Sequence, residues 1–449
     1  MCCHVPFKGI FRLKNIPRFV SWFLWQLAAI PCRDNVANRW ALIKSRIMKN
    51  RSFYLIVVIA LGLHACIPLK SDTFRENEKV AQKDYLVYQI NEDPKQRNLF
   101  FYDPINHTSS QILADWNVNI DGFSLSANNR LAFSSSQDGN SNIYILDYPF
   151  MGNTPTKITF DKSVNDTPIS WSPDGHYLLL DSFQADGKKL SLWDGKNFLD
   201  IYDYHGQINE ITWSAQGHLA FTEFSLADPA PDVDEGEVYI WDGNSTVSAS
   251  QNPSGNDRFP AWSKDGRQLA FLSNRNGKYN IFLWDGISKK KNLPDVKTFV
   301  NVAPGLPEYF SSPTWTSTNS IAFSTGYKND EHAQIYEWDG KKVRNISQNP
   351  LSHNGGQTWR NDGDWAFTTF FSKSQDLYIR DNNNRTLLET RGQYSPAWSQ
   401  KGLLIFCAPD NSKSWTLSMW NNGKVISIAH GDFVIAKWNN GEFVFCSYG

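Results

Sequence analysis

The residues best suited to chemistry in this 449-residue chain are acidic, and many of them directly precede glycine. The repeated cases are Asp174, Asp194, Asp242, Asp265, Asp285 and Asp339. Aspartate beside glycine is typical of a tight turn, where the carboxylate accepts hydrogen bonds from nearby backbone N–H groups. The spacing therefore predicts a structural role for these carboxylates, not a catalytic or metal-binding one.

A second acidic group lies in the segment 228–237, whose sequence is DPAPDVDEGE. Asp232, Asp234 and Glu235 are weak candidates for calcium ligands. The twelve-residue pattern that ends in a bidentate glutamate is missing, so we expect a solvated acidic loop without a metal. No cysteine pair has C-x-x-C spacing, which argues against a zinc site. We expect no cofactor.

Nucleophilic catalysis finds no support in the sequence. The G-x-S-x-G pattern of serine hydrolases is absent. A glycosidase would need two carboxylates about 5–10 Å apart, which sequence alone cannot place. We therefore expect a protein that binds and does not catalyse.

Residues 48–66 have the architecture of a bacterial signal peptide. Lys49 and Arg51 precede an uncharged run from Phe53 to Leu63, and Ala65 comes directly before Cys66. Leu63-His64-Ala65-Cys66 resembles the lipobox, in which the cysteine is lipidated, although His64 replaces the usual small residue. An uncleaved anchor and a soluble secreted form are the alternatives. Each of them places the rest of the chain outside the cytoplasm.

The remaining amino-terminal segments have no predicted function. Met48 offers a second start, so residues 1–47 are expected to be a disordered extension or not to be translated. Residues 67–84 are polar and are predicted to be a tether. Ten basic residues and one acidic residue lie between Met1 and Ala65, so the rest of the chain carries a net charge of −10. Such an acidic body should not bind nucleic acid.

Residues 85–449 contain one repeated unit. Tryptophan recurs at positions 171, 213, 262, 315, 359, 398 and 438, at intervals of 39 to 53 residues. Each unit divides into four strand-like runs, A to D, joined by turn signals such as Asp242-Gly243. Four antiparallel strands per repeat of this length predict an all-β protein with a single β-propeller. The repeated tryptophans are expected to pack between blades and not to stack on sugars.

The strand count favours eight blades, with seven as the alternative. Strand B of the first blade is expected at Tyr85 to Gln89. The last A strand, Val434 to Trp438, would then complete that blade with strands from both ends of the chain. The run from Phe443 to Cys446 has no place in this scheme.

The phrase Trp171-Ser172-Pro173-Asp174-Gly175, with its following Leu-Ala-Phe and Ile-Tyr-Leu-Trp-Asp type runs, resembles the repeat of TolB-like propellers. It is also similar to propellers attached to prolyl oligopeptidase-type peptidases. The resemblance covers roughly residues 85–449. It implies a propeller that binds other proteins in the bacterial periplasm or at its membranes.

We therefore expect a lipid-anchored scaffold of the bacterial cell envelope that binds a protein or an envelope polymer. The alternative is an envelope hydrolase or lyase that acts on glycan or peptide in the propeller channel. Long connections on a rigid scaffold are common recognition sites, so we expect binding on the face that bears the B–C and D–A connections. Its aromatic candidates are Phe224, Phe299, Tyr309, Phe310, Phe370 and Phe371.

Cys407 and Cys446 each follow a phenylalanine in a B-like run of consecutive units. Equivalent positions on neighbouring blades should lie farther apart than the Cα spacing of about 4.4–6.8 Å that a disulfide requires. We therefore expect no disulfide between them.

Overall fold

The computed structural model describes residues 84–447, with short gaps. The gaps are residues 94–95, 115, 117–119, 138, 186, 226–234, 254, 285–299, 302–308, 327–332, 349–352, 361, 372–373, 382–383, 391–393, 410–413, 432 and 439–442. The chain divides into two units, residues 1–75 and 76–449, and the described residues belong to the second. Within them, no helix is long and apolar enough to cross a membrane.

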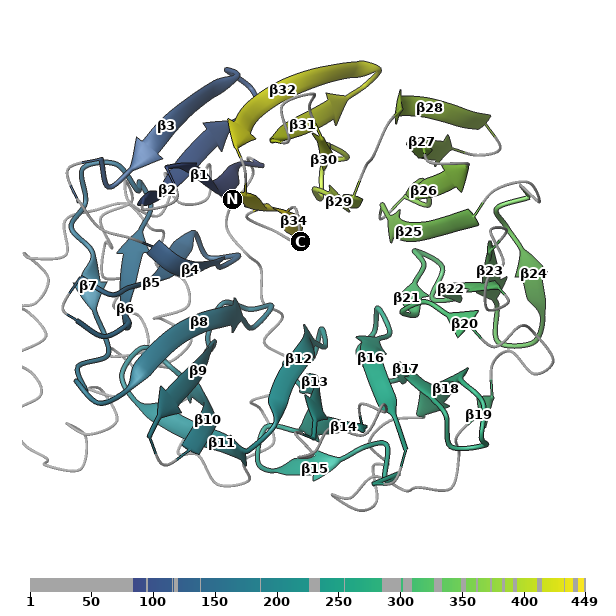
Figure 1. Ribbon diagram of the computed structural model, residues 1–449, viewed down its shortest axis with the longest axis horizontal. Coiled ribbons are helices and arrows are strands. Elements are labelled where there is room, and N and C mark those ends of the chain that lie inside the picture. Colours follow the sequence, from purple (N-terminus) through teal and green to yellow (C-terminus); the bar gives the residue numbers. More distant parts are fainter. Residues whose placement is uncertain are drawn as a thin grey trace, which may run out of the picture. The chain divides into compact units, whose positions relative to one another are not determined.

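The second unit is a β-propeller of eight antiparallel sheets arranged in a ring (Figure 1). Each sheet is one blade, with strand D outermost and strand A nearest the channel, except that blade 1 has one further strand inside its strand A. The predicted fold class and the predicted number of blades are confirmed.

The strands of blades 2 to 8 follow the chain in order. Blades 2, 3 and 4 contain β4 (Ile120–Leu125), β5 (Arg130–Ser135), β6 (Asn142–Asp147) and β7 (Thr156–Lys157); β8 (Asn165–Trp171), β9 (Leu178–Gln184), β10 (Gly187–Trp193) and β11 (Phe198–Tyr204); and β12 (Gln207–Trp213), β13 (Leu219–Phe224), β14 (Gly236–Trp241) and β15 (Thr246–Ser248). Blades 5 and 6 contain β16 (Asp257–Trp262), β17 (Leu269–Ser273), β18 (Asn280–Trp284) and β19 (Val300–Asn301); and β20 (Tyr309–Phe310), β21 (Thr314–Trp315), β22 (Ile321–Gly326), β23 (Gln334–Trp338) and β24 (Val343–Asn345). Blades 7 and 8 contain β25 (His353–Trp359), β26 (Trp365–Phe371), β27 (Ser374–Asp381) and β28 (Asn384–Thr390); and β29 (Tyr394–Trp398), β30 (Leu404–Pro409), β31 (Trp415–Asn421) and β32 (Lys424–Gly431).

Burial explains why the B strands are continuous apolar runs. A strand inside a blade has a neighbouring blade against each of its two faces, so alternation between core and solvent is lost. Every side chain of β17 is buried, from Leu269 to Ser273. Side chains that project from opposite faces of this strand belong to two different core clusters, one on each side of the blade.

The ring closes through strands from both ends of the described chain. Blade 1 has the order β3 (Thr108–Ile112), β2 (Gln96–Asp103), β1 (Leu86–Asp93), β33 (Phe433–Trp438) and β34 (Phe443–Ser447). Strand β33 pairs antiparallel with β1, with Tyr88 opposite Ala436. This pairing confirms the predicted closure.

Strand β34 gives the unassigned run from Phe443 to Cys446 a place in the fold. It pairs with the inner edge of β33 and adds a fifth strand to blade 1 on the channel side (Figure 1). It also contacts β29 and β30 of blade 8. The run is therefore not the B strand of a further unit.

This position removes the reason for expecting no disulfide between Cys407 and Cys446. Cys407 lies on β30, is fully buried and is disulfide-bonded. The prediction assumed that Cys407 and Cys446 occupy equivalent positions on consecutive blades. That assumption is wrong, because Cys446 lies on β34, which runs beside β30.

The turns between strands A and B connect neighbouring blades. The Asn128 side chain donates a hydrogen bond of 2.7 Å to the backbone oxygen of Asp174. In the next such pair, Gln216 donates to the backbone oxygen of Asp265 at 3.0 Å. Gly175 has a φ of +67°, and a Cβ there would lie 2.5 Å from the Asn128 amide nitrogen, so this turn requires glycine.

Candidate functional site

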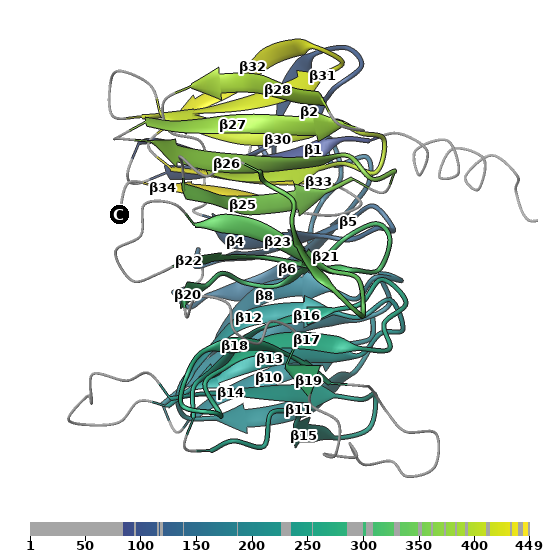
Figure 2. The same ribbon diagram turned by 90° about the vertical axis from the view of Figure 1, so that its right-hand side faces the viewer.

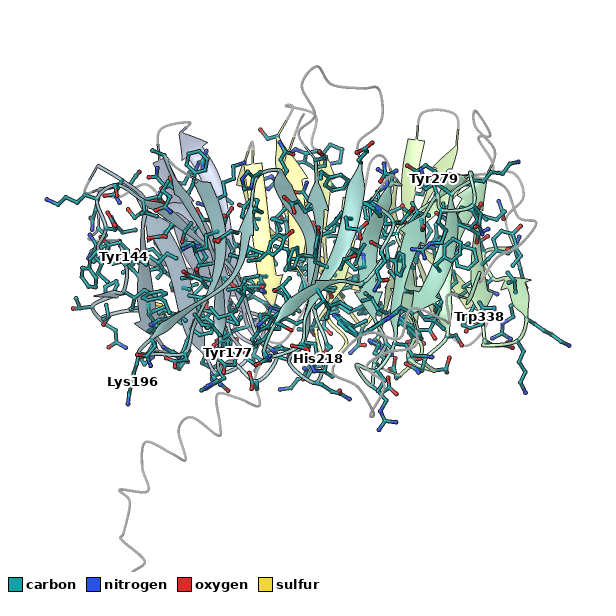
Figure 3. All side chains as sticks on the ribbon, turned by 90° about the horizontal axis from the view of Figure 1, so that it is seen from below. Tyr144, Tyr177, Lys196, His218, Tyr279 and Trp338 are labelled. Atoms are coloured by element: carbon teal, nitrogen blue, oxygen red, sulfur yellow. The ribbon has the colours of Figure 1, made fainter. Side chains whose placement is uncertain are left out.

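The propeller has two faces that differ in their connections. The turn face carries the A–B and C–D turns, and the loop face carries the B–C and D–A connections. Figure 3 shows Tyr177, Lys196, His218 and Trp338 near the turn face and Tyr279 near the loop face. The view in Figure 2 shows the blades from the side.

The aspartates beside glycine are structural, as their spacing predicts. Asp339 accepts hydrogen bonds from the backbone N–H groups of Lys341 and Lys342, at 2.9 and 2.8 Å. These bonds lower the pKa of the Asp339 carboxyl, because they favour its ionised form. The Ser263 hydroxyl similarly donates to Asp265 and lowers its pKa. Asp285 lies outside the described residues.

The repeated tryptophans of the A strands pack between blades. Trp171, Trp315 and Trp438 are buried, and each indole N–H donates to a backbone oxygen of the preceding blade. The three acceptors are the carbonyls of Ser124, Ala261 and Ala397, which all lie on A strands. The indoles therefore join adjacent A strands around the channel.

Indoles of the A strands, among them Trp171 and Trp315, line a cavity of about 820 Å³ where the channel opens on the turn face. Residues from blades 1 to 8 contribute to it, among them Ser172 and Lys264 of the A–B turns. Its volume falls in the range of about 300–1,000 Å³ that is usual for ligand sites.

The wall of this cavity, here called the channel mouth, is mostly uncharged. One ring of lining residues occupies the position just before an A-strand tryptophan: Ser170, Thr212, Ala261, Thr314, Thr358 and Lys437. Pro260, Pro313 and Pro396 add apolar surface one position earlier. The charged residues of the described lining are Lys264 and Lys437, and that lining includes no carboxylate, histidine or arginine.

Lys437 is the exceptional member of the ring. It lies on β33 and is partly buried, and neither an ion pair nor a hydrogen bond to its ammonium is found among the described residues. Burial lowers its pKa from 10.5 to about 8, because desolvation disfavours the charged amine. The channel mouth thus holds a cation without a counter-charge from its described wall.

Gln357 is a second polar group of the channel mouth without a partner. Its side chain is 8% exposed, and its Oε1 atom is buried with no hydrogen bond within the described structure. A buried acceptor of this kind is unfavourable unless a ligand or water satisfies it.

A second cavity, of about 650 Å³, lies in blade 4 at the loop face. Glu223 and Glu237 line it and are paired directly across β13 and β14. Both carboxylates already accept hydrogen bonds from neighbouring side chains and backbone groups. Glu223 accepts hydrogen bonds from the Tyr202 hydroxyl at 2.6 Å and from the His205 and Gly206 backbone N–H groups, both at 3.2 Å. Glu237 accepts hydrogen bonds from the Ser248 hydroxyl and from the backbone N–H of Asn252.

Three carboxylates of the A strands have raised pKa values, and burial also raises the pKa of Asp181 on β9. Burial raises the pKa of Asp166 and Glu210, and it raises the pKa of Asp257 to about 6. Asp257 is fully buried and lies 3.7 Å from the Arg275 guanidinium. Each of the three belongs to an A strand, and none lines the channel mouth or the cavity in blade 4.

The structure describes part of the predicted aromatic surface. Phe310 is half-buried and packs on Phe323 of its own blade, with ring centroids 5.7 Å apart. Phe224 is half-buried and lies opposite Gly236 in the sheet. The backbones of Tyr309, Phe370 and Phe371 are in strands, but their side chains, like the whole of Phe299, lie outside the described residues. A binding role for these aromatics stays a prediction.

The structure describes one of the three predicted calcium candidates. Glu235 is exposed and lines the cavity in blade 4, whereas Asp232 and Asp234 lie outside the described residues. Among the described residues, no group of three His, Cys, Asp or Glu side chains is placed to hold a metal ion. Cys66 also lies outside the described residues.

The sequence contained a signal for Lys437 that was missed. When the repeats are aligned on their tryptophans, the preceding residue is Ser170, Thr212, Ala261, Thr314, Thr358, Ala397 or Lys437. Six of these are small and one is a long cation.

No protein-family model and no curated protein matches the chain. Solved structures match the chain in fold. Dipeptidyl peptidase 4 from Porphyromonas gingivalis matches with 12% identity and a TM-score of 0.51, over 77% of this chain and 57% of that one. Prolyl oligopeptidase B from Galerina marginata matches with 10% identity and a TM-score of 0.50, over 72% and 56% of the two chains.

TolB from Acinetobacter baumannii also matches, with 12% identity and a TM-score of 0.36 over 81% of this chain and 83% of that one. The matches to the two peptidases span little more than half of their chains. At these sequence identities the structural similarity concerns the fold and does not indicate an activity. The comparisons therefore show that the chain shares the β-propeller fold, and they show the fold alone.

Proposed function

We propose that this protein is a binding scaffold of the bacterial cell envelope that takes part of a protein or polymer partner into its channel mouth. The observation that carries the proposal is the cavity of about 820 Å³, whose wall combines apolar, hydroxyl and amide groups. Ligand sites commonly have such walls, in which a few polar groups orient the ligand. The repeated Trp171-Ser172-Pro173-Asp174-Gly175 phrase supports a place among TolB-like propellers.

The composition of the channel mouth favours binding over the alternative of hydrolysis or elimination. Glycan hydrolases use a pair of carboxylates at the scissile bond. The described lining of the channel mouth includes none. The paired glutamates of blade 4 lie at the loop face and are held by hydrogen bonds to neighbouring groups.

Two features support a location outside the cytoplasm. The segment 48–66 has the basic, apolar and small-residue order of a signal peptide that ends in a lipobox. Cys407 is disulfide-bonded, and such bonds persist mainly in oxidising compartments. A lipid on Cys66 would hold the propeller at the membrane, with residues 67–84 as the tether.

Filling the channel mouth should abolish partner binding. Thr212 is half-buried and lines the cavity, so Thr212→Trp places a large ring where the ligand would enter. The full-length protein is immobilised and exposed to detergent-solubilised envelope fractions. We expect at least a tenfold loss of the captured partner.

Thr386→Trp is the matched control, because Thr386 is exposed on the outermost strand of blade 7. Capture should persist in this variant. Equal capture by both variants, with unchanged melting temperatures, would exclude the channel mouth. The substitutions Phe299→Ser, Tyr309→Ser and Phe310→Ser then test the loop face.

Cys66→Ala should remove the lipid anchor. Metabolic labelling with a fatty-acid analogue should mark the wild-type protein and leave the variant unlabelled, and the variant should move to the soluble fraction. Cys407→Ala serves as the control, because it removes a cysteine without touching the lipobox. Equal labelling of wild type and Cys66→Ala would contradict lipidation at this residue.

A further inference from the structure

We infer that the ligand of the channel mouth is an acidic polypeptide segment, whose carboxylate pairs with the Lys437 ammonium while its backbone N–H donates to Gln357. This inference rests on the proposed binding function and specifies the ligand class for that site. It follows from the Lys437 ammonium and the Gln357 Oε1 atom, which the described wall leaves without partners. The indole N–H groups of Trp262 and Trp359 in the same wall are also buried without a partner, and they can donate to the carbonyl or carboxylate oxygens of such a segment.

The first step concerns charge. Lys437 is the cation within the ring of residues that precede the A-strand tryptophans, and every other member of that ring is small and neutral. Lys264, the other lysine of the wall, is exposed at an A–B turn. A cation removed from water is unfavourable unless an anion or a set of acceptors compensates for the lost hydration. No carboxylate of the described wall does so, and an anionic ligand would.

The second step concerns hydrogen bonding. The Oε1 atom of Gln357 is buried in the same wall and accepts nothing from the described residues. It requires a donor, which a polypeptide backbone presents at every residue except proline. A carboxylate ion offers no donor of its own. A ligand chain that carries both a carboxylate for Lys437 and an N–H group for Gln357 would therefore satisfy both groups.

The third step distinguishes a polypeptide from an acidic polysaccharide. Sugars present many hydroxyl donors, which need acceptors when they are buried. The described wall has no carboxylate to accept them, and the Gln357 Oε1 atom is the one buried side-chain acceptor that this wall leaves without a partner. It instead offers the rings of Pro260, Pro313 and Pro396, against which peptide side chains can bury apolar surface.

The test uses two fluorescein-labelled pools of short random peptides on the full-length protein. One pool contains Asp and Glu, and the other has Asn and Gln at the same positions. Labelled oligogalacturonate is the polysaccharide arm. Fluorescence polarisation is measured with wild type, Lys437→Met, Lys437→Arg and Lys196→Met. Lys196 is the control because it is exposed on a C–D turn outside the described lining of the channel mouth.

We expect the wild type to bind the acidic pool at least tenfold more tightly than the amide pool. Lys437→Met should remove this preference, Lys437→Arg should retain most of it, and Lys196→Met should change it less than threefold. Acetylation by acetic anhydride, followed by mass spectrometry, should show that the acidic pool protects Lys437 in the wild type.

Other outcomes overturn the inference in distinguishable ways. If both peptide pools bind wild type equally and Thr212→Trp abolishes this binding, the inference of an acidic ligand fails and the proposed binding function stands. Binding of oligogalacturonate without binding of either pool would overturn the polypeptide. If no probe binds while Thr212→Trp still loses its envelope partner, the inference fails and the proposed function stands. If that partner is also retained, both fail.

Discussion

Replacing Cys407 with alanine is expected to lower the free energy of unfolding by about 2–4 kcal/mol, the usual effect of removing a native disulfide. Cys407 is disulfide-bonded and fully buried, in a core cluster that joins blade 8 to blade 1. A covalent link there restricts the unfolded chain at the point where the ring closes. Denaturant unfolding of the full-length protein, monitored by tryptophan fluorescence, measures the change.

Cys446 is the expected partner, because its strand β34 contacts β30, which carries Cys407. Peptide mapping without reductant identifies the partner directly. The control is reductant added during unfolding, which should destabilise the wild type as the substitution does and leave Cys407→Ala unchanged. A linked peptide that joins Cys407 to any other cysteine, or an equal stability of variant and wild type, would contradict a role for the bond in closing the ring.

Ring closure also shows how far the sequence predicts the fold. The tryptophan phrase marks each A strand, and a fixed order of four strands follows from it. The number of blades and the pairing of β33 with β1 could therefore be predicted. The position of β34 could not be predicted, because its run of apolar residues resembles that of a B strand such as β30. Its partner is decided by which sheet edge is free, and that depends on the assembled ring.

The candidate site was harder to predict than the fold. Alternation within a strand tells which side chains face a neighbouring blade, but it does not tell which of them reach the channel. Lys437 and Gln357 come from β33 and β25, which are far apart in sequence and meet at one cavity only because the blades form a ring. Comparing the repeats with one another would have singled out Lys437. Nothing in the repeat singles out Gln357, whose Oε1 is exceptional only for its missing partner.

Lys437→Met should stabilise the protein at pH 7 by about 1–2 kcal/mol, because a partly buried amine whose pKa is lowered opposes folding. The pKa of Lys437 is about 8 in the folded state, against an ordinary value of 10.5. A shift of this size corresponds to at most about 3.5 kcal/mol, since each pKa unit is about 1.4 kcal/mol. We expect less than this limit because the side chain remains partly exposed.

The difference in free energy of unfolding between Lys437→Met and the wild type should depend on pH. Below pH 8 both the folded and the unfolded protein carry the charged amine, so the whole penalty is present. Between pH 8 and 10.5 the unfolded chain binds more protons than the folded one at this position, so the wild type gains stability relative to Lys437→Met. The advantage of the variant should therefore be largest near pH 7 and should nearly vanish above pH 10.5. Thermal unfolding of both proteins across this range measures the difference, in which the titration of other groups cancels.

Lys264→Met is the control, because Lys264 lines the same cavity but is exposed. It should change the free energy of unfolding by less than about 0.5 kcal/mol, as surface substitutions usually do. A Lys437→Met variant that is less stable than the wild type at pH 7 would mean that the ammonium already has a partner in the folded chain. A variant that is more stable but no longer prefers acidic peptides would show that the cation opposes folding and serves binding, which is the usual relation between a binding site and stability.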